Sequence, residues 1–141
     1  MREINKIIIH CSATREGQEM SVETIRSWHL KRGFSDIGYH YLIHLNGLIS
    51  YGRNIKRSGA HTKGQNKNSI GVCYVGGVES KRGANGKFIA KDTRTPDQKL
   101  ALLDLLKTLK RLSPNATIHG HNEFAAKSCP CFDVKNEYCN I

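Results

Sequence analysis

The chain has 141 residues, a length typical of one domain, and 22 Lys and Arg against 12 Asp and Glu give it a formal net charge of +10. Hydrophobic residues make up 38% of the chain and charged residues 24%, which excludes a wholly disordered protein. No apolar run approaches the ~18 residues that a membrane span needs, and the polar flanks of Ile7-Ile8-Ile9 argue against a signal peptide. We therefore expect one domain over residues 1–141, synthesised in the cytoplasm.

The net charge indicates the kind of partner, and the number of cysteines indicates whether they form disulfides. A strong positive excess predicts attraction to polyanions, either nucleic acid or an anionic wall or membrane surface. The basic residues are scattered and no aromatic residues alternate with them, so we expect no nucleic-acid partner. Five Cys, an odd number without an export signal, favour reduced thiols over a disulfide framework.

The first elements are a strand and a helix. Residues 4–10 are short, rich in β-branched side chains and end in polar residues, which predicts a buried strand. Ser21 can cap a helix that runs to about Arg32 and stops at Gly33. We expect Ile25 and Trp28 to lie on the inner face of this helix.

The middle of the chain predicts a hairpin and a core strand. Residues 39–45 and 48–51 flank Asn46-Gly47, a strong signal for a β-hairpin turn. Residues 69–75 form a further apolar strand pattern. Residues 76–94 are rich in Gly, Lys and Asn and are expected to form a long surface loop without a recognisable motif.

The clearest element begins at Thr95-Pro96-Asp97-Gln98, which has the pattern of a capping box with Pro at the first helical position. Ser113-Pro114 ends this helix, and residues 116–119 predict a last strand. Because strands and helices alternate and one hairpin is antiparallel, we expect an α/β domain with a central mixed β-sheet flanked by α-helices. Five leucines are expected on one helix face: Leu102, Leu105, Leu106, Leu109 and Leu112.

Ligand-type residues gather near the expected strand ends. His10 ends the first strand, His119 and His121 close the last one, and Cys129 and Cys131 follow on a loop. Zinc binds imidazole nitrogen and thiolate sulfur, and a catalytic site uses three protein ligands with a fourth position open. Spacing alone does not decide between His119 and His121, nor between Cys129 and Cys131.

Five segments in order resemble the zinc-dependent N-acetylmuramoyl-L-alanine amidases of type 2, a family that includes amidase-type phage lysozymes and the peptidoglycan recognition proteins. The resemblance is strongest to the phage lysozymes and covers about residues 4–133. The segments are Ile8-Ile9-His10-Cys11-Ser12-Ala13-Thr14, Gly38-Tyr39-His40-Tyr41, Gly59-Ala60-His61-Thr62-Lys63-Gly64, Asn68-Ser69-Ile70-Gly71-Val72 and Lys127-Ser128-Cys129-Pro130.

The resemblance implies one Zn²⁺ held by His10, His121 and Cys129. The cysteine matters most, because recognition proteins that only bind peptidoglycan typically lack it. Its presence favours an enzyme, and the alternative is a non-catalytic peptidoglycan-binding module of the same fold. The resemblance also implies that Tyr39 and Lys127 are catalytic.

Three further residues match family positions that contact the muramyl-peptide: His61, Thr62 and Asn68. The implied reaction is hydrolysis of the amide bond between N-acetylmuramic acid and L-alanine in bacterial peptidoglycan. We expect a monomer without a separate wall-binding domain. The missing signal peptide favours an endolysin that reaches the cell wall after release by another factor.

Overall fold

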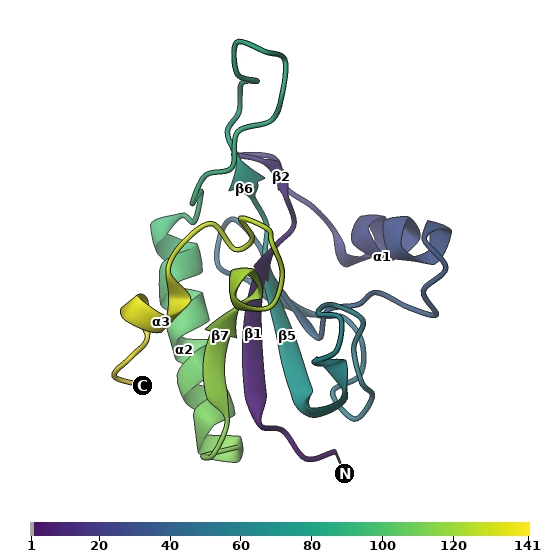
Figure 1. Ribbon diagram of the computed structural model, residues 1–141, viewed down its shortest axis with the longest axis vertical. Helices are drawn as coiled ribbons and strands as arrows, with labels where there is room; N and C mark the ends of the chain where they lie inside the picture. The colour runs from purple at the N-terminus through teal and green to yellow at the C-terminus, as the bar shows by residue number, and fades with distance from the viewer. Residues whose placement is uncertain (1) are drawn as a thin grey trace.

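The computed structural model describes residues 2–141 and is built around a five-stranded sheet in the order β4-β3-β5-β1-β7. Four strands are parallel: β3 (Tyr41–Ile43), β5 (Ser69–Tyr74), β1 (Lys6–Cys11) and β7 (Thr117–Gly120). Only β4 (Ile49–Tyr51) runs antiparallel, paired with β3 through the hairpin around Asn46-Gly47. The expected mixed sheet is therefore confirmed, and Figure 1 shows β7, β1 and β5 side by side.

Helix α2 (Pro96–Leu112) covers one face of the sheet. The capping box is formed, with the Thr95 side chain accepting from the Gln98 N–H and the Gln98 side chain accepting from the Thr95 N–H. The first four leucines of the expected stripe are buried against β1 and β5. The prediction for Leu112 was wrong, because it lies in the last turn at the edge of the stripe and is 76% exposed.

Helix α1 (Val22–Lys31) packs against part of the opposite face. Ser21 caps it as predicted, and the chain leaves it through Gly33, whose φ of +93° lies in the left-handed region. Ile25 is buried, but Trp28 is 40% exposed and so was wrongly assigned to the inner face. His29, four residues after Ile25, takes that place because i and i+4 align along a helix.

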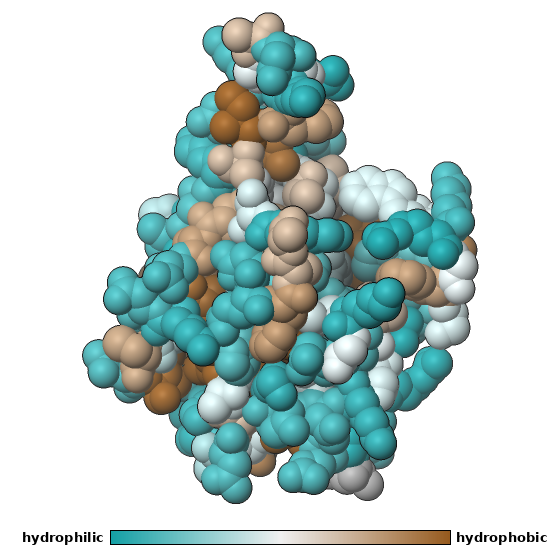
Figure 2. Space-filling view, in the orientation of Figure 1, coloured by the Kyte–Doolittle hydropathy of each residue, from teal (hydrophilic) through white to brown (hydrophobic). Residues whose placement is uncertain are grey.

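The segment 76–94 is more ordered than a plain loop. Its start forms β6 (Gly77–Val78), which pairs in parallel with β2 (Thr14–Arg15), and a bridge joins Val78 to Ala90. The segment therefore folds back on itself and stands out from the body of the molecule (Figure 1). Most of the face seen in Figure 2 is hydrophilic, but the segment that stands out from the body carries apolar residues.

Short elements complete the chain: the 3₁₀ turns η1 (Asn66–Asn68) and η2 (His121–Glu123), and the helix α3 (Val134–Glu137). Within residues 2–141, none of the helices combines the length and apolar character that crossing a bilayer requires.

Candidate active site

The site lies on the face of the sheet that α2 leaves free. Side chains alternate along β1, so Ile7 and Ile9 pack under α2 while His10 projects from the other face. His10 is in register with Cys73 of β5, which packs on the α1 side. His10 thus stands where the open face meets the end of β1.

His121 and Cys129 join His10 from the far end of the sequence. His121 begins η2 directly after β7, and Cys129 lies on the loop that follows. One ligand atom from each of the three residues lies within 4.8 Å of the others. The Cys129 Sγ lies 3.8 Å from the His10 Nδ1 and also accepts a hydrogen bond from the Cys11 N–H at 3.2 Å. The fold therefore brings two imidazoles and a thiol close enough together to bind one metal ion.

This cluster fits a zinc ion in chemistry and in spacing. Ligand atoms on one tetrahedral zinc lie roughly 3.3–3.6 Å apart, given bonds of about 2.0–2.3 Å, so only small shifts would close the cluster on an ion. Burial lowers the pKa of His10 well below its usual value, and the nearby His61, His121 and Lys127 lower it further. Burial and Lys127 also lower the pKa of His121. Both imidazoles are thus neutral near pH 7, the form that binds a metal.

The competing ligand candidates point elsewhere. The His119 ring lies between Thr117 Oγ1 at 2.6 Å and Glu123 Oε1 at 2.8 Å. The Cys131 Sγ faces the Gly77 carbonyl at 3.4 Å. His121 leaves the face of His119 because the strand ends at Gly120 and a 3₁₀ turn begins.

A cavity of about 480 Å³ opens beside the cluster and carries positive charge. Lys127 lines it together with His121, and the charge of its ammonium group lowers the pKa of both His10 and His121. Tyr39 lies just before β3 rather than within it, and its ring centroid is 5.1 Å from that of His10. Burial raises the pKa of Tyr39 well above 10, and the nearby Cys73 thiol adds to the rise.

Of the three expected substrate contacts, the structure brings two to the site. His61 and Thr62 line the cavity and lie within hydrogen-bond distance of His10. Asn68 does not line it; its side chain donates to the Glu3 carbonyl at 2.9 Å, at the start of β5. Asn66 takes the place expected for Asn68, because the η1 turn directs its side chain back toward the backbone of His61 and Thr62.

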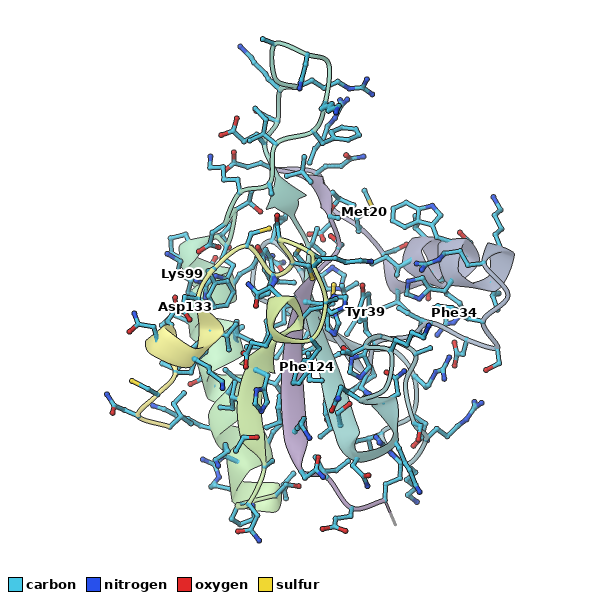
Figure 3. The ribbon with its side chains drawn as sticks, in the orientation of Figure 1. Met20, Phe34, Tyr39, Lys99, Phe124 and Asp133 are labelled. Atoms are coloured by element: carbon cyan, nitrogen blue, oxygen red, sulfur yellow. The ribbon has the colours of Figure 1, made fainter. Side chains whose placement is uncertain are left out.

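Other cavity residues were not anticipated from the sequence. Arg32 and Phe34 come from the end of α1, with the guanidinium 5.1 Å from the ring centroid, and Phe124 comes from the segment after η2. Figure 3 shows Phe34 and Phe124 on these two segments, with Tyr39 near the ends of β1 and β5. Lys63, which belongs to the motif at residues 59–64, adds a further cation to the cavity. Nothing in the local sequence pattern marks the two phenylalanines, since segments distant in sequence bring them to the cavity.

Comparison with known proteins identifies the family. The profile of the N-acetylmuramoyl-L-alanine amidases matches residues 1–132. The chain belongs to this family. The endolysin of Escherichia phage T7 is 45% identical to this amidase-family chain over 129 residues, which cover 92% of the chain and 82% of the endolysin.

Solved structures of other proteins share the fold. The N-acetylmuramoyl-L-alanine amidase LysC from Clostridium intestinale superimposes with a TM-score of 0.79 at 25% identity, over 96% of this chain and 82% of its own. A complex of the peptidoglycan recognition proteins LCa and LCx bound to tracheal cytotoxin gives a TM-score of 0.77 at 27% identity, over 99% and 82%. The same fold thus occurs both in an amidase and in recognition proteins.

Proposed function

We propose that the chain is a zinc-dependent N-acetylmuramoyl-L-alanine amidase that hydrolyses the amide bond between N-acetylmuramic acid and L-alanine in bacterial peptidoglycan. The observation that carries the proposal is the cluster of His10, His121 and Cys129 at a basic cavity. The relatives named as endolysins and amidases support the same reaction. A bound zinc ion would polarise the scissile carbonyl and activate water for attack on it.

Lys127 and Tyr39 have complementary roles in this proposal. The Lys127 ammonium lines the cavity and would stabilise the negative charge that develops on the carbonyl oxygen. A tyrosine keeps its proton at neutral pH, and burial raises the pKa of Tyr39 further, so it would act as a hydrogen-bond donor rather than a base. From its place beside His10, it would donate toward the leaving amine or orient the attacking water.

The further cations extend the proposal to the substrate. Arg32 and Lys63 line the same cavity as Lys127, which suits the carboxylates of an anionic muramyl-peptide. We propose that the chain acts as a monomer and reaches the wall as an endolysin. Its net charge of +10 would speed its association with anionic wall polymers.

The test is incubation of purified peptidoglycan with the protein, with and without a chelator, followed by mass spectrometry of new N-terminal alanine. Cys129→Ala should release no alanine and retain no zinc, while the exposed Cys139→Ala serves as a matched control and should behave like the wild type. A wild-type protein that binds peptidoglycan without releasing alanine would show the alternative, a non-catalytic binding module. Full activity in zinc-free Cys129→Ala would contradict the proposal.

A further inference from the structure

The second ring nitrogen of His10 has a partner of its own. The His10 Nδ1 faces Cys129, while its Nε2 lies 2.8 Å from the His61 Nδ1. The Thr62 Oγ1 is a more distant neighbour of the same Nε2, at 3.2 Å. A neutral imidazole that offers Nδ1 to a metal carries its proton on Nε2 and needs an acceptor there. The His61 Nδ1 stands at the position of that acceptor.

The surroundings of His61 allow its Nδ1 to act as this acceptor. Its ring is buried, with 8% of the residue exposed. The His61 Nε2 lies 3.2 Å from the Ser69 Oγ. With its proton on Nε2 donated to Ser69, His61 presents its Nδ1 lone pair to His10 at 2.8 Å, while the Thr62 Oγ1 lies 3.0 Å from the same nitrogen.

The backbone is shaped around this ring. A Cβ at Gly59 would lie 2.7 Å from the His61 Cδ2, and a Cβ at Gly71 would lie 2.6 Å from the same atom. Both contacts are shorter than real Cβ atoms allow, so the ring fits only between two glycines. The Asn66 side chain also accepts from the backbone N–H groups of His61 and Thr62, both at 2.9 Å. Such confinement suits a fixed support better than a side chain that must adapt to a substrate.

We infer that His61 is a positioning residue that holds His10 in the orientation and tautomer required for metal binding, and that it acts on the metal more than on the muramyl-peptide. This inference rests on the proposed function, because it assumes that the bound metal is zinc. In metal sites generally, removing the hydrogen-bond partner of a ligand histidine changes metal affinity by about 10- to 100-fold.

The test compares three variants by competition for zinc with a chromophoric chelator. His61→Phe keeps a ring but has no acceptor, and its zinc affinity should fall by about 10- to 100-fold. His61→Asn can present its Oδ1 near the position of the lost Nδ1, and should recover most of this affinity. Thr62→Val removes only the longer contact and should have the smaller effect. In zinc-saturated protein, the KM of His61→Phe should stay near the wild-type value.

Wild-type zinc affinity in His61→Phe, together with a raised KM, would overturn the inference and return His61 to substrate contact. Failure of the wild type itself to bind zinc would count against the proposed function instead. Should His61→Phe not fold, long-range ¹H–¹⁵N spectra of the zinc-loaded wild type provide a test without substitution. They should show protons on Nε2 of both His10 and His61, and a proton on the His61 Nδ1 would refute the inference.

Discussion

Replacing Arg94 with methionine should destabilise the protein strongly, because this buried guanidinium ties the C-terminal segment to the body of the molecule. It donates to both oxygens of Glu137 at 2.7 and 2.8 Å and to both oxygens of Asp92 at 2.9 Å. It also lies 3.4 Å from the ring centroid of Phe132, and its side chain is 1% exposed. Methionine keeps the aliphatic stem and removes the charge and the donors.

The expected loss follows from the exposure of the two carboxylates. Removing one partner of a buried ion pair costs about 3–5 kcal/mol, because the remaining charge is left buried. Asp92 and Glu137 keep 29% and 40% exposure, so water can rehydrate them and the loss should fall near the lower bound. We expect about 3 kcal/mol for Arg94→Met.

Urea unfolding at neutral pH measures this loss. For an m-value of about 1.5 kcal/mol/M, the midpoint should fall by about 2 M. Arg26→Met is the matched control, because Arg26 pairs with Asp36 at 2.8 Å but is 35% exposed. Its loss should stay below about 1 kcal/mol. A loss of less than about 1 kcal/mol in Arg94→Met would refute the reasoning.

Three further predictions concern the site, the core and acid stability. Lys127→Met should lower kcat by about 10²-fold or more with little change in zinc content, and unchanged turnover would contradict the assigned role. Leu106→Ala, at a fully buried position on the inner face of α2, should cost about 3–4 kcal/mol in urea unfolding, while Leu112→Ala should stay within about 0.5 kcal/mol. Hydrogen bonds from the buried arginine lower the pKa of Glu137 and, against burial, that of Asp92. Their stabilisation is therefore present above about pH 4–5 and lost as the pH falls, so unfolding at pH 3 should be easier than at pH 6, by less in the arginine variant.

The elements that the sequence predicts well depend on local signals. The capping box at Thr95, the Ser21 cap and the turn at Asn46-Gly47 are all formed, because each needs only neighbouring residues. The prediction for Trp28 was wrong because α1 packs against the sheet along a narrow stripe of residues. Helical periodicity alone does not show which side of that stripe stays exposed to solvent.

The site required information beyond local patterns. Alternation along a strand puts His119 and His121 on one face, and only the change to a 3₁₀ turn separates them. The resemblance to a known family selected His121 and Cys129, which the structure then brings to His10. The support of His10 by His61 joins residues 51 positions apart, so it depends on the folded sheet and loops and could not be seen in the sequence.

The contact between His10 and Cys129 spans 119 positions of the chain, which has a consequence for how the active protein arises. On a ribosome, His10 emerges early, but its two companions follow only after α2 and β7 have been made. No fragment that ends at α2 can assemble the cluster, so activity should appear only with the last strand and the loop after it. An ion bound there would also close one of the longest loops in the fold, and would hold the beginning and the end of the chain together.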